Sequence, residues 1–298
     1  MSATKRSKTA CWIEAMRLRT LPVSLAGVIY AAGLGLLSWR FSLVPALLCL
    51  LFALLAQIAS NFANEYYDFK GGLDRAGRQG PRRGVTEGDI TPGAMKRATF
   101  ATLACACLAG CILVWLYGSW WMYLVGIATA LGVMAYSTGP YPLSHHGFGE
   151  VAVICFFGII PVTLTYMLMG GPFGWWLAAA AAGIGLMGAN VLIVNNYRDI
   201  EDDRAVGKRT LAVRLGLRAM SAIYLANGIL ALMLTLPPWL AAGPGWWIVP
   251  ALYLCGHTVL YFRLTHLSGA RLNPLLGMTA VLMLIYAAGF VITVTASA

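Results

Sequence analysis

Residues 42–68 read SLVPALLCLLFALLAQIASNFANEYYD, an apolar run that ends in amide and carboxylate side chains. The apolar part, 42–60, is long enough to cross a bilayer as a helix, because about 20 residues span the ~30 Å hydrocarbon core. In lipid the backbone must satisfy its own hydrogen bonds, so we expect this run to be helical. If the helix continues to the last carboxylate, four polar residues at i, i+3, i+4 and i+7 share one face: Asn61, Asn64, Glu65 and Asp68.

The rest of the chain is as apolar as this stretch. Of its 298 residues, 59% are hydrophobic and 11% are charged, whereas about a quarter of a soluble domain is charged. Because apolar runs recur without a polar linker, we expect one all-α transmembrane domain over residues 1–298. Nine runs are long enough to span the membrane: 21–38, 42–60, 98–117, 120–137, 151–169, 175–194, 219–236, 246–262 and 274–296.

The charged residues orient these spans. With nine crossings, the N-terminus and the loops 61–97, 138–150, 195–218 and 263–273 share one face, which then holds 20 of the 21 Lys and Arg residues; only Arg40 lies opposite. By the positive-inside rule that face is cytoplasmic, so we expect a bacterial-type inner membrane protein with its C-terminus outside. Residues 1–20 are expected to form an interfacial segment. Orientation and anionic lipid explain the net charge of +10 without nucleic acid.

A second polar cluster follows the sixth predicted span. Residues 195–203 read NNYRDIEDD, in which Asn195, Asp199 and Asp203 are spaced by four and would share a helix face. Four crossings separate the second and sixth spans, so both helices run in the same direction and bring their clusters to the same surface. For a single acid a solvated helix end is the better interpretation, but two clusters at corresponding positions favour one shared site.

Oxygen-only clusters of this kind favour a hard cation. Mg²⁺ typically takes one or two carboxylates and bridges them to substrate phosphates. Basic residues that could bind the remaining phosphate oxygens flank both clusters. Neither a G-x-x-x-x-G-K-[ST] loop nor a G-x-G-x-x-G after a strand is present, which disfavours nucleotides. The flanking basic residues are Lys70, Arg75, Arg78, Arg82, Arg83, Arg198, Arg204, Lys208 and Arg209.

The two clusters resemble the paired aspartate-rich motifs of the UbiA superfamily of intramembrane prenyltransferases, N-D-x-x-D and D-x-x-x-D. Here they read NEYYD at 64–68, with Glu65 in place of an aspartate, and DIEDD at 199–203. Further stretches resemble the branch of this superfamily that acts on 1,4-dihydroxy-2-naphthoate: RLRTLP at 17–22, YSTGPYPL at 136–143, GFGE at 147–150, NNYRD at 195–199 and GKRTL at 207–211.

The resemblance implies nine transmembrane helices around a central cavity and a Mg²⁺-dependent transfer from a polyprenyl diphosphate. The acceptor is then 1,4-dihydroxy-2-naphthoate, which loses CO₂ as diphosphate leaves, to give demethylmenaquinone. Catalytic roles are expected for Asn64, Asp68, Asp199 and Asp203, which with Glu65 and Asp74 are also the expected metal ligands. Substrate contacts are expected from Arg19, Lys70, Arg82, Arg83, Tyr136, Tyr141, Asn195, Asn196, Lys208 and Arg209.

Several alternatives stay open on the sequence. Another aromatic acceptor such as 4-hydroxybenzoate would use the same motifs, and membrane lipid would surround either enzyme. His145 and His146 could serve as a base or contact the acceptor, although a polar loop is the simpler interpretation. A secondary transporter is disfavoured, because such proteins place ionisable residues near the membrane midplane and only His257 lies in the middle of a predicted span.

Overall fold

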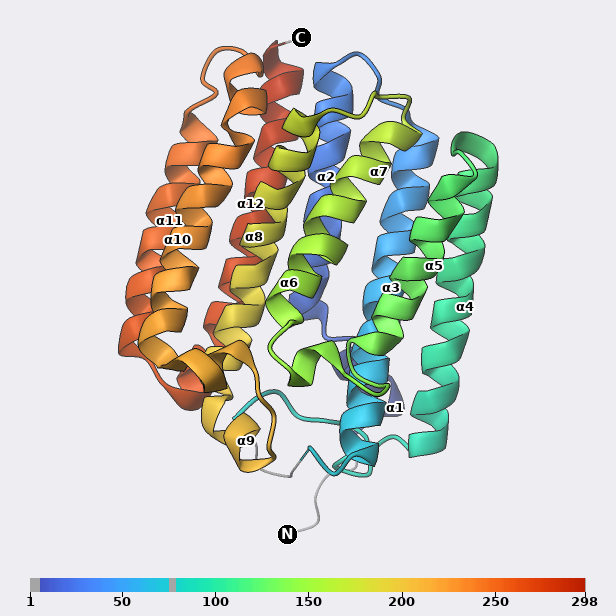
Figure 1. Cartoon of the computed structure of the whole chain (residues 1–298), viewed down its shortest axis with the longest axis vertical. Helices are drawn as coiled ribbons and strands as arrows, with labels where there is room; N and C mark the ends of the chain where they lie inside the picture. Colours follow the sequence, from blue (N-terminus) through green and yellow to red (C-terminus); the bar gives the residue numbers. More distant parts are fainter. Residues whose placement is uncertain (1–5, 75–78, 298) are drawn as a thin grey trace.

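The computed structural model describes residues 6–74 and 79–297, and all regular structure in them is helical (Figure 1). Short helices connect long ones that run roughly parallel or antiparallel. The short helices are α1 (Lys8–Ala15), η1 (Leu18–Thr20), η2 (Leu143–His145), α9 (Ile200–Ala205) and η4 (Gly269–Leu272). The longer ones are α2 (Leu21–Leu37), α3 (Leu43–Lys70), α4 (Pro92–Tyr117), α5 (Trp121–Ala135), α8 (Trp175–Arg198), α10 (Leu211–Ala241), α11 (Ile248–His266) and α12 (Asn273–Ser297).

One further long segment is composite. It begins as α6 (Gly149–Val153), continues as the π-helix η3 (Ile154–Ile159) and ends as α7 (Ile160–Leu168). A π-helical turn inserted in an α-helix is uncommon and is often found near functional sites. This segment packs directly on α8, where a Cβ on Gly158 would lie 2.3 Å from the Cα of Gly185. Two glycines therefore let the helices approach backbone to backbone, as is common inside membranes.

The described helices agree with a membrane protein. Seven helical segments in the described part of the chain are long and apolar enough to span a bilayer, and α5 is a shorter apolar helix. Each predicted run overlaps one long helical segment. The count of nine crossings depends on α5 and on α11, which do not belong to the seven, so it stays a prediction.

The polar ends of α3 and α8 differ from each other. α3 continues without a break through Lys70, so the predicted extension of this helix past its apolar part is confirmed. α8 stops at Arg198, and Asp199 sits between it and α9 with φ −93° and ψ 9°. The helix predicted over 195–203 is interrupted at Asp199, but Asn195, Asp199 and Asp203 still face one pocket, as their spacing predicts.

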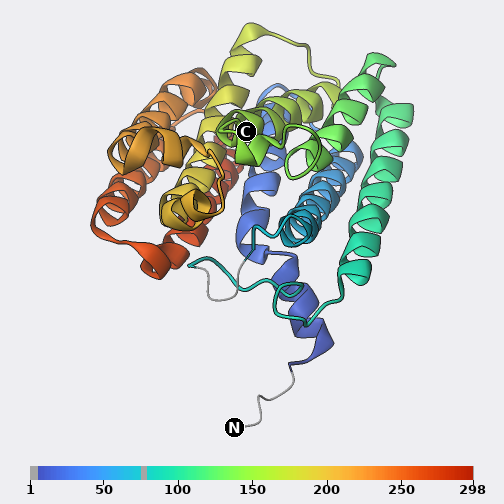
Figure 2. The ribbon, with the colours of Figure 1, turned by 60° about the horizontal axis from the view of Figure 1, so that its bottom comes forward.

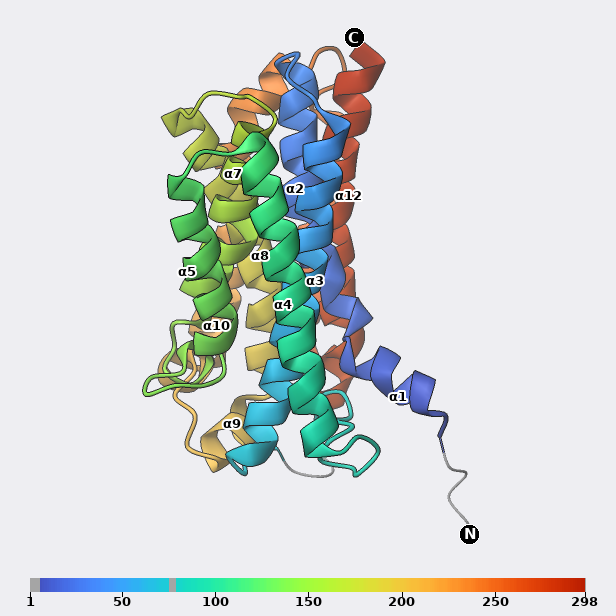
Figure 3. The same cartoon turned by 90° about the vertical axis from the view of Figure 1, so that its right-hand side faces the viewer.

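Both polar ends lie at the same end of the bundle. In Figure 1 this is the lower end of the bundle, where α1 and α9 also lie, whereas α12 ends at the opposite, upper end. With the lower end turned forward, α9 and the end of α3 come toward the viewer (Figure 2). α1 projects outward from the bundle at this level (Figure 3). The edge of the Trp12 ring in α1 meets Phe62 of α3, with centroids 5.6 Å apart.

Candidate functional site

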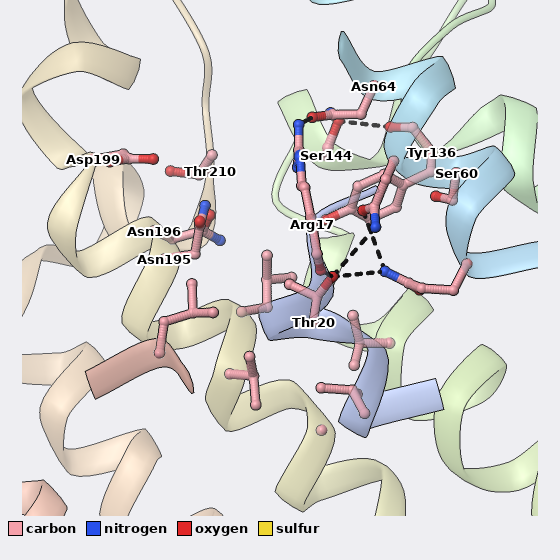
Figure 4. Close-up of a pocket in the computed structure, with 18 of the residues that line it drawn as sticks. Arg17, Thr20, Ser60, Asn64, Tyr136, Ser144, Asn195, Asn196, Asp199 and Thr210 are labelled. Atoms are coloured by element: carbon pink, nitrogen blue, oxygen red, sulfur yellow. Dashed lines mark hydrogen bonds between the residues drawn. The ribbon is translucent and has the colours of Figure 1, made fainter. Parts of the chain in front are cut away.

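A polar pocket of about 160 Å³ lies at this end of the bundle. Its walls come from the ends of α3 and α8, from α9, and from the segments that precede α2, α4, α6 and α10. Figure 4 shows the α3 side chain of Asn64 facing the pocket from one side and Asp199 from the other. The predicted site residues that line it are Asn64, Asp68, Arg83, Tyr136, Asn195, Asn196, Asp199, Asp203 and Lys208.

Asp68 is buried in the α3 wall between two nitrogen partners. The Nζ of Lys208 lies 3.2 Å from Oδ2, and the Nε2 of His145 lies 3.3 Å from Oδ1. His145 was interpreted as a polar loop residue, but its ring contacts this carboxylate. The α3 carboxylate is thus held by the segments that precede α6 and α10.

Asn64, one turn before Asp68, lies among cationic side chains. Its Oδ1 accepts hydrogen bonds from Nη2 of Arg17 at 2.7 Å and from Nη2 of Arg83 at 3.1 Å. Its amide nitrogen donates to Ser137 Oγ at 3.2 Å. Two guanidinium groups therefore converge on this wall, an arrangement well suited to a polyanionic ligand.

The α8 wall is organised by Arg198, which is 4% exposed. Its Nε and Nη2 each donate to a carboxylate oxygen of Asp199 at 2.7 Å. The same guanidinium donates to Oδ1 of Asn195 at 2.8 Å and to Oδ1 of Asn273, at the start of α12, at 2.9 Å. A buried charge needs such partners, and this one fixes Asp199 and Asn195 relative to α12.

Arg17 is a pocket residue that sequence reasoning missed. It sits between α1 and η1 in the left-handed region, with φ 53°. A non-glycine residue adopts this conformation rarely and at a cost. The turn directs the side chain into the pocket, whereas Arg19 is exposed and does not line it. The structure therefore places Arg17, and not Arg19, in the pocket lining, and the RLR stretch at 17–19 was the signal in the sequence that pointed to this segment.

The structure does not place Glu65 at the pocket as a metal ligand. Its side chain is buried and Oε1 accepts a hydrogen bond from the backbone N–H of Val85 at 3.0 Å. Asp74 is likewise outside the pocket lining, with Oδ2 3.4 Å from Nε of Arg83. Both acids instead contact the segment between α3 and α4 that carries Arg83: Glu65 does so from α3, whereas Asp74 belongs to that segment.

Four expected substrate contacts also lie away from the pocket lining. Lys70 is exposed as the last residue of α3, and Arg82 pairs with Asp89 at 2.6 Å. Tyr141 is 51% exposed and stacks on His146, and Arg209 is exposed, with its backbone N–H donating to the His145 carbonyl. Arg75 and Arg78 lie outside the described residues.

The pocket lining fits a divalent cation that arrives with a phosphate ligand. In the described residues no three His, Cys, Asp or Glu side chains converge on one point, which argues against an all-protein metal cage. Instead Asp68, Asp199 and Asp203 line one pocket together with amide oxygens. Mg²⁺ needs only one or two carboxylates when water and substrate phosphates complete its octahedron.

A larger apolar cavity of about 490 Å³ adjoins the polar pocket, between α2, α3, α4, α5 and the α6–α7 segment. Both are lined by Gln57, Ser60, Tyr136, Val153 and Phe157, so they meet at these residues. Cys107 and Cys111 of α4 and Ile127 and Leu131 of α5 line the cavity and are also exposed. The cavity therefore reaches the outer surface of the bundle between α4 and α5.

Tyr136, just after α5, stands where the pocket and the cavity meet. The phenol of a tyrosine has a pKa of about 10 in the absence of perturbing neighbours. The hydroxyl is therefore neutral at physiological pH. Its ring borders polar groups on one side and apolar side chains on the other.

Comparisons with known proteins agree on one family. Residues 20–274 match the UbiA prenyltransferase family. The chain is 37% identical over 221 residues to 1,4-dihydroxy-2-naphthoate octaprenyltransferase of Escherichia coli (strain K12), covering 72% of each chain. It is 36% identical to the enzyme of the same name from Mycobacterium tuberculosis, covering 78% of this chain and 81% of that one.

Solved structures show the same fold. A UbiA homolog from Archaeoglobus fulgidus bound to DMAPP and Mg²⁺ aligns with a TM-score of 0.68 at 15% identity, over 94% of this chain and 99% of that one. An apo UbiA homolog from Aeropyrum pernix K1 aligns with a TM-score of 0.69 at 16% identity, over 91% and 97%.

Proposed function

This chain belongs to the UbiA prenyltransferase family, and from that premise we propose that it transfers a polyprenyl chain from its diphosphate to 1,4-dihydroxy-2-naphthoate. The observation that carries the proposal is the convergence of Asp68 and Asp199, from helix ends 131 positions apart, on one pocket beside an apolar cavity. Such a site can hold a charged head and an apolar tail together. Relatives that are 37% and 36% identical to this chain over 221 and 241 aligned residues carry this activity in their names.

The pocket is assigned to the diphosphate. Asn64, Asp68, Asp199 and Asp203 would hold Mg²⁺, which when bound stabilises negative charge on the diphosphate and makes it a better leaving group. Arg17, Arg83 and Lys208 line the same pocket and would bind the phosphate oxygens directly. The C–O bond at the first prenyl carbon then breaks, and its electron pair leaves with the diphosphate.

The adjoining cavity is assigned to the polyprenyl tail. Its lining is almost entirely apolar, and its opening between α4 and α5 would let a tail longer than the cavity continue into lipid. With the head in the pocket and the tail in the cavity, the first prenyl carbon lies near Tyr136. The π-face of this neutral phenol would then stabilise the allylic cation.

The acceptor completes the reaction. The naphthoate ring carbon that bears the carboxylate attacks the cation, and loss of CO₂ restores the aromatic ring. The product is the reduced form of demethylmenaquinone. Arg17 is well placed to bind the acceptor carboxylate or the donor phosphates, because it lines the pocket and its guanidinium reaches Asn64 there.

We assign nine crossings to the chain, with the pocket at the cytoplasmic face of the inner membrane. α5 and α11 complete the set of helices that cross, and α1 projects outward at the level expected for an interfacial helix. The end of α12 lies at the opposite end of the bundle from the pocket, which supports an external C-terminus.

The experiment is an assay of the purified protein in detergent with a prenyl diphosphate, 1,4-dihydroxy-2-naphthoate and Mg²⁺. Mass spectrometry should find a prenylated product that has lost CO₂, and EDTA should abolish its formation until Mg²⁺ is restored. A parallel reaction with 4-hydroxybenzoate tests the acceptor. Prenylation of 4-hydroxybenzoate in preference to the naphthoate would overturn the assignment.

A further inference from the structure

A buried acid, Glu150, lies behind the pocket rather than in it. It is the second residue of α6, is 7% exposed, and is not one of the described residues that line the pocket. Its Oε1 accepts a hydrogen bond from Nδ2 of Asn196, at 2.9 Å. Its Oε2 is buried and has no hydrogen-bond partner among residues 6–74 and 79–297. An unpaired buried carboxylate oxygen is destabilising, so its presence calls for a reason.

The hydrogen bond fixes the orientation of a pocket side chain. A carboxylate can only accept, so Asn196 must turn its NH₂ group toward Glu150. The amide oxygen, Oδ1, then points away from Glu150. Because Asn196 lines the pocket and Glu150 does not, that oxygen is the atom that Asn196 presents to the pocket.

The other three pocket asparagines are used differently. Oδ1 of Asn61 accepts from Gln57, Oδ1 of Asn64 accepts from Arg17 and Arg83, and Oδ1 of Asn195 accepts from Arg198. No hydrogen bond reaches Oδ1 of Asn196 in the described part of the chain. Among the asparagines that line the pocket, Asn196 is therefore the one whose amide oxygen is held in place without accepting a hydrogen bond from a described residue.

We propose that Glu150 is a positioning residue that holds the amide oxygen of Asn196 toward the divalent cation of the pocket. This inference rests on one part of the proposed function, namely that a divalent cation binds in the pocket together with a diphosphate. If the amide were free to turn, its NH₂ group would face the cation and repel it. Groups behind a metal ligand commonly control affinity in this way, and their removal costs about 10-fold to 100-fold.

The test measures cation binding without turnover. Mn²⁺ is titrated by electron paramagnetic resonance into purified protein with geranyl diphosphate and no acceptor. Glu150→Leu removes the acceptor for Asn196 and should weaken Mn²⁺ binding about 10-fold or more. Glu150→Gln keeps an acceptor oxygen for the same N–H and should stay within about threefold of the parent. A purely structural acid would lower stability in both variants and leave the Mn²⁺ affinity of the folded fraction unchanged.

A double variant tests the proposal if the Glu150→Leu protein does not fold. In Glu150→Gln combined with Asn196→Asp, the hydrogen bond reverses and an oxygen again faces the pocket, so Mn²⁺ binding should stay near the parent level. Unchanged binding in folded Glu150→Leu, or a reversed pair that binds Mn²⁺ about 10-fold more weakly, would overturn the proposal. These Mn²⁺ measurements remain valid even if the assigned acceptor is wrong, because no acceptor is present in them.

Discussion

The side-chain ammonium of Lys208 lies 3.2 Å from a carboxylate oxygen of Asp68, although 140 positions separate them in the chain. His145 contacts the other oxygen of the same carboxylate, and its carbonyl accepts a hydrogen bond from Arg209 N–H at 2.8 Å. Two loops that lie far apart in the sequence therefore meet at the end of α3. A single buried carboxylate joins the first polar cluster to the loop that follows the second cluster, and this contact helps to bring the two distant motifs together.

Neutralising either aspartate should abolish turnover without unfolding the protein. In Asp68→Asn and in Asp199→Asn, we expect kcat to fall at least ~100-fold, because each loses a negative charge at the cation site while keeping an oxygen that can accept hydrogen bonds from its partners. Thermal unfolding in detergent checks folding. Glu201→Ala is the matched control, since Glu201 belongs to the same cluster but its side chain is 77% exposed and pairs only with Arg204 in the described residues. Full activity of either aspartate variant would refute the assigned roles.

Arg17 and Arg19 offer a direct comparison of two arginines two positions apart. In Arg17→Met we expect KM for the prenyl diphosphate or the naphthoate to rise roughly 10-fold to 100-fold, the range for losing a hydrogen bond between charged groups. Arg19→Met should behave like the parent, because Arg19 is exposed away from the pocket. Steady-state kinetics with each substrate varied in turn shows which one Arg17 binds. Equal defects in both variants would contradict this placement.

The helices and the two polar ends were predictable from the sequence because their signals are local. Apolar length predicts each membrane helix, and the spacing of Asn64 and Asp68 predicts that both face one side of α3, as they do. The position of Asp199 in the pocket also follows from the even number of crossings. These predictions needed only helix geometry and the requirement that backbone in lipid be hydrogen bonded.

The positions of the other residues at or near the pocket depend on tertiary contacts, which no local sequence pattern encodes. Arg17 enters the pocket through a left-handed turn, a conformation that sequence spacing does not predict for arginine. Glu65 has the spacing of a ligand but meets the backbone of Val85, because the segment after α3 folds back against that face. His145 reaches Asp68 from a loop 77 positions away. Each depends on how loops pack, which is decided by tertiary structure.

Glu65 should prove dispensable as a metal ligand. Glu65→Gln retains an oxygen that can accept from Val85 N–H, so we expect activity within about threefold of the parent and an unchanged Mg²⁺ concentration for half-maximal rate. Glu65→Ala loses this hydrogen bond to a charged acceptor and should destabilise the protein by about 1–3 kcal/mol. It should also raise KM for the donor, because the segment that carries Arg83 loses its anchor. A large rise in the Mg²⁺ requirement of Glu65→Gln would restore Glu65 as a ligand.

The apolar cavity should determine how the enzyme responds to donor length. Gly126 of α5 lines this cavity, and a Cβ added there would meet no atom within 4 Å, so a larger side chain fits without strain and fills the space. In Gly126→Phe we expect the rate with octaprenyl diphosphate to fall about 10-fold or more, since overfilling an apolar site costs ~1–3 kcal/mol. Dimethylallyl diphosphate, whose tail ends before the obstruction, should react at nearly the parent rate.

Gly277 of α12 provides the control for Gly126, because a Cβ there also meets no atom within 4 Å but the residue does not line the cavity. Gly277→Phe should therefore change the rate only slightly, and by the same factor with the short donor as with the long one. The ratio of the two rates, measured in the same detergent, separates a blocked tail path from a general loss of stability, which would lower both. If Gly126→Phe keeps the parent ratio, the tail does not occupy the space between α4 and α5, and its path must lie elsewhere in the bundle.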